Sequence, residues 1–496
     1  MKGKLKILMV FPEVAPFVKT GEIGDVGGAL PKALKEMGHD VRVITPQYRT
    51  INERKYILRD VIRLQNIDIS LGGKNVCIDV KSAFLPNSKV QVYFIDYKPF
   101  FFKEGLYADS KSGKNYADND RRFILFSKGV LKTLIKLQWQ PDVIHCHDWQ
   151  SGLIPFFLET VYRDDPFFGK TFTLFTIHNL NLQGNFNPKC ISYMVEDSQS
   201  DIPADTIKFQ EQCSFLKAGV VYSDIVNATN EKYSQKVAFQ LNGKNHGENI
   251  LLWRKDKAIH SVANGIDYSV WNPELDQLIA ETYSISDLDG KEENKQALLK
   301  NQGLPVSPKI PVIGMLSHLM DQAGMDLVQN CFNELMKMGV YFIFLGKGDK
   351  SFRQSLGQIH KKNTGRVGVN FSHDESLNHL LIAGADILLM SSSHTILESN
   401  KLYCLKYGTI PIIYFPKGSE EIIRPFDSET GKGAAFIFKG FDRRQFLKAV
   451  KRAVRTFEDQ KLWLKIMKNG MREDFSWHHS SKKYIKLYLK CISKKK

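Results

Sequence analysis

The sequence predicts an α/β protein built from two doubly wound domains. Short apolar runs rich in β-branched residues alternate with segments of helical spacing, which is typical of βαβ units around a parallel sheet. This alternation fills the first half of the chain and starts again after about residue 310. A length of 496 residues is too great for one hydrophobic core, so at least two domains are expected.

The first half supplies the strands and helices of one domain. We predict strands at Lys6–Phe11, Val41–Thr45, Val90–Ile95, Val143–His145, Thr171–Ile177 and Ile225–Ala228, with helices at Gly28–Met37 and Arg122–Leu137. We expect this domain to cover residues 1–250, and a polar, proline-containing connection to cover residues 251–310.

The second half repeats the pattern. We predict strands at Val312–Leu316, Tyr341–Leu345, Val367–Phe371, Ile387–Met390 and Ile410–Tyr414, with helices such as Met325–Met338 and Asn400–Tyr407. The expected second domain covers residues 311–472, and residues 473–496 form a C-terminal helix with a basic tail.

Composition and the N-terminus predict a cytoplasmic protein. Apolar residues make up 43% of the chain and charged residues 25%, which is ordinary for a globular protein. No apolar run approaches the roughly 20 residues of a membrane-spanning helix, and the chain enters a strand without a recognisable leader. The seven scattered cysteines contain no CxxC pair, which fits a reducing compartment. No membrane partner is expected.

The net charge of +16 raises the question of an anionic partner. Basic residues are spread along the chain, and their densest cluster is the tail from Lys482 to Lys496. Aromatic interleaving of the kind that RNA-binding sheets use is not evident, so we expect no nucleic acid partner. We interpret the charge as a solvated basic face, with a general attraction for anionic ligands as the alternative.

A glycine-bearing loop from Lys19 to Gly28 follows the first predicted strand and leads directly into a helix. Its backbone N–H groups and the helix N-terminus favour an anion, and Lys19 adds a point charge for a phosphate. An ordinary turn is the alternative, because glycine-rich turns before helices are common.

Polar side chains also follow three later strands. His145, His147 and Asp148 lie at the end of one strand, His178 follows the next, and Asn264 precedes a glycine farther on. The carboxyl ends of parallel strands are where α/β proteins place ligand contacts. A buried structural His–Asp pair and a simple Asn-Gly turn are the alternatives. No other ligands of suitable spacing lie near the histidines, so no metal site is predicted.

These motifs, together with several others, are spread in a definite order and spacing along nearly the whole chain. The full set is Pro12–Pro16, Lys19–Asp25, Gly28–Pro31, Asp118–Asn119 with Arg122–Phe123, His147–Trp149, Thr176–Asn179 with Gln183–Gly184, Asn264–Pro273, Gly384–Asp386, Leu402–Tyr403 with Tyr407–Pro411, and Asp474–Trp477. In this order and spacing the chain resembles the bacterial glycogen synthase and plant starch synthase family, which transfers glucose from ADP-glucose to α-1,4-glucan. The resemblance implies a GT-B fold, in which two Rossmann-like domains enclose the active cleft, and it implies no metal or other cofactor.

The resemblance also implies roles for individual residues. Lys19 would contact the phosphates of ADP-glucose, with the Gly24–Asp25 loop beside them. Asp148 and His178 would be the catalytic residues beside the transferred glucose and the acceptor, and Asn264 would line the sugar site.

The chain departs from the family pattern at positions that serve the donor. His318 and Ala323 stand where the family has arginine and lysine, and Thr395 replaces a glutamate that would touch the sugar hydroxyls. Glu398 replaces a glycine beside the phosphate, and Glu22 replaces a glycine in the first loop. Cations neutralise the leaving group in a metal-free transfer, so these changes predict a weakened donor site.

Three hypotheses follow from this pattern. The leading one is a retaining glucosyltransferase of the glycogen synthase type, with ADP-glucose as donor, the non-reducing end of an α-1,4-glucan as acceptor, and impaired activity. The alternative is a catalytically inactive glucan-binding or regulatory homologue, with an active synthase paralogue as its partner. A third is a GT-B transferase that uses another donor.

Overall fold

The computed structural model describes residues 3–180, 182–195, 202–229, 253–254, 258–316, 322–346, 350–372, 374–391, 398–415 and 423–493, without the side chains of residues 322, 323, 350, 351, 398 and 399. The chain divides into two compact units. The first unit comprises Met1–Gly265 and Trp477–Lys496, and the second comprises Ile266–Ser476. Residues 266–310, expected as part of a connection, therefore fold with the second unit, and the C-terminal helix folds with the first.

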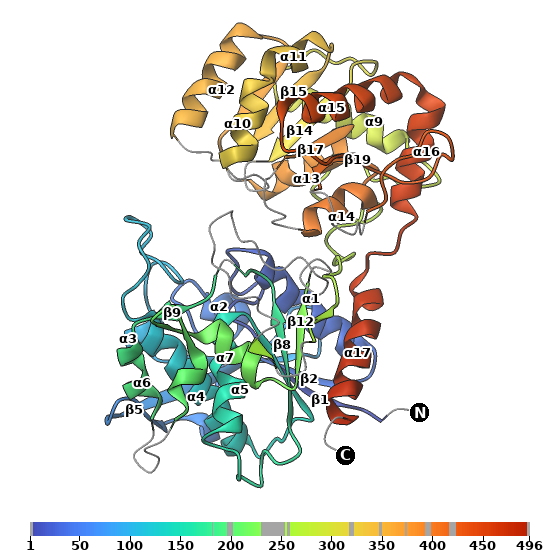
Figure 1. The fold of residues 1–496 in the computed structure, drawn as a ribbon. Helices are drawn as coiled ribbons and strands as arrows, with labels where there is room; N and C mark the ends of the chain where they lie inside the picture. Colours follow the sequence, from blue (N-terminus) through green and yellow to red (C-terminus); the bar gives the residue numbers. More distant parts are fainter. Residues whose placement is uncertain are drawn as a thin grey trace. The chain divides into compact units, whose positions relative to one another are not determined.

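The first unit contains one large sheet and a small separate one (Figure 1). Its strands are β1 (Lys6–Val10), β2 (Asp40–Pro46), β3 (Arg59–Asp60), β4 (Ile67–Ser70), β5 (Asn75–Phe84), β6 (Gln91–Asp96), β7 (Val143–His147), β8 (Phe172–Ile177), β9 (Asn185–Phe186), β10 (Lys208–Phe209), β11 (Gln212–Ser214), β12 (Ile225–Ala228) and β13 (His260–Ser261). Its helices are α1 (Glu22–Glu36), α2 (Glu53–Tyr56), α3 (Lys98–Phe101), α4 (Asn119–Leu137), α5 (Leu153–Glu159), α6 (Ile191–Met194), α7 (Phe215–Tyr222) and α17 (Trp477–Ser493).

The large sheet has the doubly wound strand order. Its strands follow each other as β13-β12-β8-β7-β1-β2-β6-β5-β3, and β4 pairs with β5. All pairings from β13 to β6 are parallel. The order reverses between β1 and β7, and such a reversal creates a crevice at the carboxyl ends of the strands. The predicted parallel strands are thus confirmed, whereas the antiparallel β3–β5 excursion was not predicted.

The second unit is a smaller copy of the same architecture. Its strands are β14 (Val312–Leu316), β15 (Tyr341–Leu345), β16 (Val367–Asn370), β17 (Ile387–Met390), β18 (Ile410–Tyr414) and β19 (Phe436–Phe438). They form one parallel sheet in the order β16-β15-β14-β17-β18-β19. Its helices are α9 (Asp289–Asn301), α10 (Gln322–Asn330), α11 (Phe332–Lys337), α12 (Lys350–Lys362), α13 (Glu375–Gly384), α14 (Glu398–Lys406), α15 (Arg443–Glu458) and α16 (Gln460–Met471). The prediction of one helix over Met325–Met338 was wrong, because α10 ends before Cys331 and α11 begins after it.

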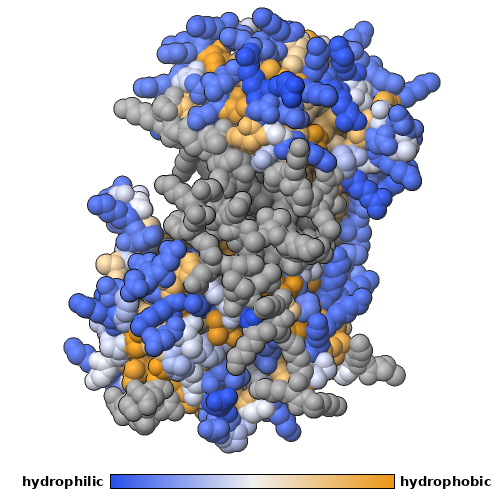
Figure 2. Space-filling model, viewed as in Figure 1, coloured by the Kyte–Doolittle hydropathy of each residue, from blue (hydrophilic) through white to orange (hydrophobic). Residues whose placement is uncertain are grey.

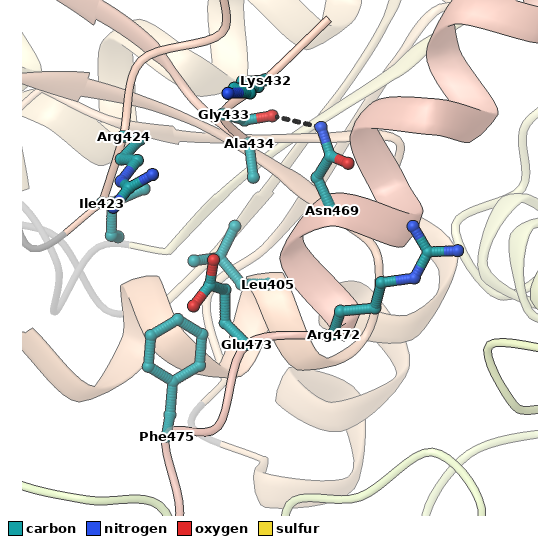
Figure 3. A pocket seen from close by; sticks show the side chains of 10 residues that line it. All are labelled: Leu405, Ile423, Arg424, Lys432, Gly433, Ala434, Asn469, Arg472, Glu473 and Phe475. Carbon is teal, nitrogen blue, oxygen red and sulfur yellow. Dashed lines mark hydrogen bonds between the residues drawn. The ribbon is translucent and has the colours of Figure 1, made fainter.

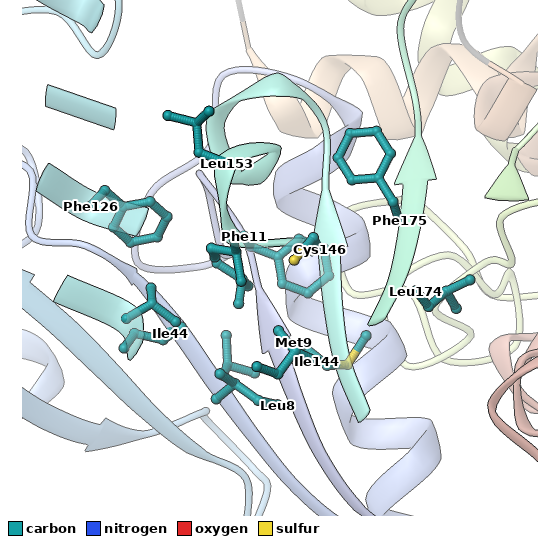
Figure 4. Close-up of a cluster of buried hydrophobic side chains, with 14 of the residues drawn as sticks. Leu8, Met9, Phe11, Ile44, Phe126, Ile144, Cys146, Leu153, Leu174 and Phe175 are labelled. Atoms are coloured by element: carbon teal, nitrogen blue, oxygen red, sulfur yellow. The ribbon is translucent and has the colours of Figure 1, made fainter. Parts of the chain in front are cut away.

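Each unit has its own hydrophobic core. Figure 4 shows part of the core of the first unit, where side chains from β1, β7 and β8 pack against α4 and α5. Leu8, Phe11, Ile144 and Phe175 of this cluster are fully or almost fully buried. A second apolar cluster fills the space around β14, β15 and β17. Two separate cores fit two independently packed domains.

Two close approaches fix helices against the parallel strands of the first unit. A Cβ atom at Gly28 of α1 would lie 2.6 Å from the carbonyl oxygen of Ala15, so only glycine lets this helix approach the loop after β1. Helix α17 packs against α1, β7 and β8 (Figure 1). Its Tyr488 hydroxyl lies 2.9 Å from Nδ1 of His145. His145 is buried between this tyrosine and Thr176, which gives it a structural role.

The face of the protein that Figure 2 shows is mostly polar where it is described. In Figure 2 hydrophilic residues cover most of the described surface that faces the viewer. Among the described residues, no helix combines the length and the apolar character that crossing a bilayer requires.

Candidate active site

The site residues predicted in the first half follow the carboxyl ends of parallel strands in one sheet. The segment from Lys19 to Asp25 follows β1, Asp148 follows β7, His178 follows β8 and Asn264 follows β13. Gly24 and Asp25, expected in a loop before a helix from Gly28, instead lie in the first turn of α1, which begins at Glu22. Strands β1 and β7 flank the point where the strand order reverses. Doubly wound proteins bind their ligands outside the sheet at this point.

Asp148 is held in an unusual backbone conformation at the end of β7. Its φ of 56° and ψ of −179° lie in a region that side-chain-bearing residues rarely adopt. The neighbouring chain fixes this conformation, because the Asp148 N–H donates to the carbonyl of Thr176 at 3.0 Å and its carbonyl accepts from the N–H of Ser151 at 3.1 Å. Such strain is typical of functional positions and fixes the direction of the carboxylate.

The Asp148 carboxyl group is buried and has a raised pKa. Its Oδ1 atom accepts hydrogen bonds from the backbone N–H groups of His178 at 2.7 Å and Asn179 at 3.4 Å. Burial raises the pKa of Asp148 to about 7, the nearby charges of Glu13 and Glu22 add to this, and the two N–H donors oppose it. A carboxyl group of this kind exists in both protonation states near neutral pH.

Two histidines form a neutral pair beside Asp148. The Nδ1 atom of His147 lies 3.0 Å from Nε2 of His178, and one of the two rings donates this hydrogen bond. His147 is fully buried and stacks on Phe11 with a centroid distance of 3.8 Å. Burial lowers the pKa of His178 to about 3 and lowers that of His147 well below its usual value. Both rings are therefore uncharged at neutral pH and suited to bonding hydroxyl groups.

The loop after β1 is compact and carries compensating charges. Nζ of Lys19 lies 2.7 Å from Oδ1 of Asp25 in the first turn of α1. A Cβ atom at Gly24 would lie 3.1 Å from Cβ of Lys19, so glycine lets the lysine pack across the start of the helix. The structure therefore brings together these three predicted residues.

Glu13 is a residue of this site to which the sequence analysis gave no role. Its side chain is 2% exposed, and its carboxylate accepts hydrogen bonds from the N–H and the hydroxyl of Thr20 and from the hydroxyl of Tyr107 at 2.8 Å. These bonds tie the loop that carries Lys19 to a second loop of the same unit. A charged residue inside an otherwise apolar stretch after a buried strand was the signal that could have identified it.

Asn264 reaches the start of α1 from a distant part of the sequence. Its Nδ2 atom donates a hydrogen bond of 2.9 Å to Oε1 of Glu22. The Asn264 side chain is 5% exposed, and its Oδ1 atom has no hydrogen-bond partner among the described residues. The predicted residues thus form pairs at one sheet edge: Lys19 with Asp25, Asp148 with His178, and Asn264 with Glu22.

The replaced donor positions follow β14 and β17 in the sequence. His318 and Thr395 lie outside the described residues. Ala323 belongs to α10 and Glu398 begins α14, but their side chains are not among those described. Their expected roles stay predictions.

A separate cavity of about 350 Å³ lies in the second unit. Figure 3 shows its mixed lining, in which the charged side chains of Arg424, Lys432, Arg472 and Glu473 occur together with the apolar side chains of Leu405 and Phe475. None of the predicted site residues lines it. No group of three or more His, Cys, Asp or Glu side chains that could hold a metal ion occurs in the described part of the chain.

Comparison with known proteins gives consistent matches over the whole chain. Residues 6–252 match the family model of the starch synthase catalytic domain. The glycogen synthase of Moorella thermoacetica is 35% identical and covers 100% of this chain and 99% of its own length. The glycogen synthase of Desulforudis audaxviator is 34% identical over 99% of this chain and 97% of its own length.

A solved structure shows the same likeness. The catalytic domain of starch synthase IV from Arabidopsis thaliana, bound to ADP and acarbose, superposes with a TM-score of 0.84 at 26% identity. The match covers 99% of this chain and 100% of that one, and it confirms the predicted GT-B fold of two Rossmann-like domains. The sequence matches and the shared fold agree, and the chain belongs to the glycogen synthase and starch synthase family of glycosyltransferases.

Proposed function

We propose that this chain is a retaining glucosyltransferase that moves glucose from ADP-glucose to the non-reducing end of an α-1,4-glucan, and that its donor site is weakened. The observation that carries the proposal is the Asp148–His178 pair at the carboxyl ends of β7 and β8 in a chain that matches glycogen synthases over its full length. The homologues themselves support a nucleotide-sugar donor and a glucan acceptor.

The proposed step exchanges one bond at C1 of the glucose for another on the same face. The bond from C1 to the β-phosphate oxygen of ADP breaks, and a bond to O4 of the terminal glucan residue forms. The proton of that hydroxyl passes to the departing phosphate. Neutral His178 is suited to bonding a glucose hydroxyl, and the fixed carboxyl of Asp148 is suited to orienting the sugar.

The residues at the positions that serve the donor favour a slow transfer of glucose. His318 and Ala323 take the places of two family cations, and Glu398 adds a negative charge where a diphosphate would lie. Loss of one group that stabilises transition-state charge costs about 3 kcal/mol, which is about two decades in rate. Such losses are not additive within one site, so we expect a reduction of several decades at most.

The substitutions also favour a second candidate, a catalytically inactive glucan-binding or regulatory homologue that works with an active synthase paralogue. This candidate keeps the acceptor side, because Asp148 and His178 are present. It predicts that the protein sediments with glycogen but binds no ADP-glucose. The leading proposal predicts both kinds of binding, and a GT-B transferase with another donor predicts tighter binding of a different nucleotide sugar.

The proposal is tested by incubating the protein with glycogen and ADP-glucose labelled in the glucose. We expect slow incorporation of label that an exo-acting hydrolase specific for α-1,4 bonds releases again. Asp148→Asn serves as the control for transfer at this site and should abolish incorporation. If the wild-type protein binds ADP-glucose and glycogen but transfers no label above the Asp148→Asn background, the proposed activity is wrong.

A further inference from the structure

The cavity of about 350 Å³ lies at the amino ends of two strands of the second sheet. Leu405 and Ala434, which line it, come shortly before β18 and β19 in the chain. Doubly wound domains bind the ligand of their main site at the carboxyl ends of the strands, so this cavity lies at the opposite edge of its sheet. Its volume falls in the range of small-molecule sites, which begins at roughly 300 Å³.

The wall of the cavity around Gly433 is held in a fixed conformation. The Nδ2 atom of Asn469 donates hydrogen bonds to the carbonyl oxygens of Gly431 at 2.9 Å and of Gly433 at 3.0 Å, the second of which Figure 3 shows. Gly433 has a φ of +87°, and a Cβ atom there would lie 2.1 Å from the carbonyl oxygen of Pro425, so glycine is required. Because the amide nitrogen of Asn469 is occupied, its Oδ1 atom is the group that it offers to a ligand.

Three positive side chains and one negative side chain line the cavity, namely Arg424, Lys432, Arg472 and Glu473. Within the described ranges, none of these four side chains takes part in an ion pair or a side-chain hydrogen bond. The lining therefore carries a net charge of +2. Repulsion among the three cations decreases when an anion binds between them, so the cavity is suited to an anion with two negative charges.

A phosphate monoester matches this lining. It carries about two negative charges near pH 7 and three strong acceptor oxygens. An arginine guanidinium bonds two such oxygens at once, and a lysine adds a point charge. The remaining polar groups, Oδ1 of Asn469 and the carboxylate of Glu473, accept hydrogen bonds from hydroxyl groups. The half-buried ring of Phe475 and the buried side chain of Leu405 provide an apolar surface for carbon atoms.

We propose that this cavity is a second binding site, which takes the phosphate monoester of a small hydroxylated molecule. Arg424, Lys432 and Arg472 bind the phosphate, and Asn469 and Glu473 bind the hydroxyl groups. None of the residues assigned to glucose transfer lines the cavity, so the site is independent of the proposed function. It uses part of the positive charge of the chain, which amounts to +16.

The test measures the binding of glycerol 3-phosphate by calorimetry, with glycerol as its uncharged counterpart, in about 0.1 M salt, where charges act over about 10 Å. We expect saturable binding of glycerol 3-phosphate to the wild type and none of glycerol. Arg424→Gln together with Lys432→Gln removes two cations and should weaken binding at least about tenfold. Glu473→Gln removes the opposing charge and should tighten binding about threefold. All three residues are exposed, so the fold should tolerate these changes.

Arg444→Gln together with Lys448→Gln is the matched control. Both residues are exposed on α15 and neither lines the cavity, so this variant removes the same two kinds of charge elsewhere in the unit. Its dissociation constant should remain within about twofold of the wild type, because salt screens distant charges. An equal loss of affinity in this control would assign the effect to net charge and overturn the proposal.

Three further results would overturn the proposal. The first is the absence of saturable binding of glycerol 3-phosphate to the wild type. The second is binding of glycerol that equals the binding of glycerol 3-phosphate, because the phosphate would then not be recognised. The third is an unchanged dissociation constant in the variant that lacks the charges of Arg424 and Lys432, because the phosphate would then bind elsewhere.

Discussion

The backbone N–H of His178 donates a 2.7 Å hydrogen bond to Oδ1 of Asp148, and this bond joins the carboxyl ends of β7 and β8. It pairs with the buried carboxyl group of Asp148, a residue whose backbone is held at a φ of 56°. The same strand ends also place His147 within 3.0 Å of the His178 ring. The chemistry of the site therefore depends on the spacing of two adjacent strands.

Asp148 should make the stability of the protein fall as the pH rises. Its native pKa is raised to about 7, whereas an unfolded aspartate releases its proton near pH 4. Between these values the native state binds more protons than the unfolded state, so the free energy of unfolding decreases with increasing pH. Relative to Asp148→Asn, the wild type should lose up to about 4 kcal/mol between pH 4 and pH 8.

Urea titrations at several pH values measure this difference. Asp60→Asn replaces an exposed aspartate and should leave the pH dependence of the wild type unchanged. If the Asp148→Asn and wild-type curves run parallel between pH 4 and pH 8, the raised pKa of Asp148 is wrong.

Replacing Glu13 should lower the free energy of unfolding more than removing any one of the donors that bond its carboxylate. Glu13→Gln replaces one acceptor oxygen by an N–H₂ group that faces N–H or O–H donors, whereas Tyr107→Phe removes one donor only. We expect Glu13→Gln to lower the free energy of unfolding by about 2–3 kcal/mol and Tyr107→Phe by about 1 kcal/mol. Chemical denaturation measures both, and equal stability of Glu13→Gln and wild type would contradict the account.

Gly184→Ala should disturb Trp149, the residue that follows Asp148. Gly184 has a φ of +58°, and an added Cβ atom would lie 2.5 Å from Cε3 of the Trp149 ring. Gly73 has a φ of +72° but no neighbouring atom within 4 Å, so Gly73→Ala measures the backbone strain alone. We expect a loss of about 1 kcal/mol for Gly73→Ala and at least about 3 kcal/mol for Gly184→Ala. Similar losses in the two variants would show that Trp149 does not pack as described.

Sequence periodicity identified the buried parallel strands well. Val312–Leu316 and Tyr341–Leu345 were predicted with the bounds that the structure has, because a parallel strand covered on both faces is a continuous apolar run. Strand β5 was missed, since Asp79 and Lys81 interrupt its apolar pattern and its partner β6 binds it in the antiparallel direction. The break at Cys331 between α10 and α11 carries no glycine or proline that would have predicted it.

The residues of the candidate site came from sequence motifs, whereas their contacts could not be predicted. Family motifs identified Lys19, Asp148, His178 and Asn264, and parallel topology places them at one sheet edge. The bond from Asn264 to Glu22 spans more than two hundred residues, so no local pattern reveals it. The role of Glu13 likewise depends on a hydroxyl from a distant loop.

The most direct test of the central claim restores the donor side of the family pattern. A variant with His318→Arg, Ala323→Lys, Thr395→Glu and Glu398→Gly together returns the two cations and the glutamate of the family pattern, and it removes the carboxylate that we expect beside the diphosphate. The rate of glucose transfer from ADP-glucose to glycogen is measured for this variant and for the wild type. We predict that the wild type turns over well below about 10 per second, an ordinary enzyme rate, and that the variant is at least tenfold faster. A wild type that reaches that rate, or a variant that binds ADP-glucose tightly and transfers no faster, would contradict the account of a weakened donor site.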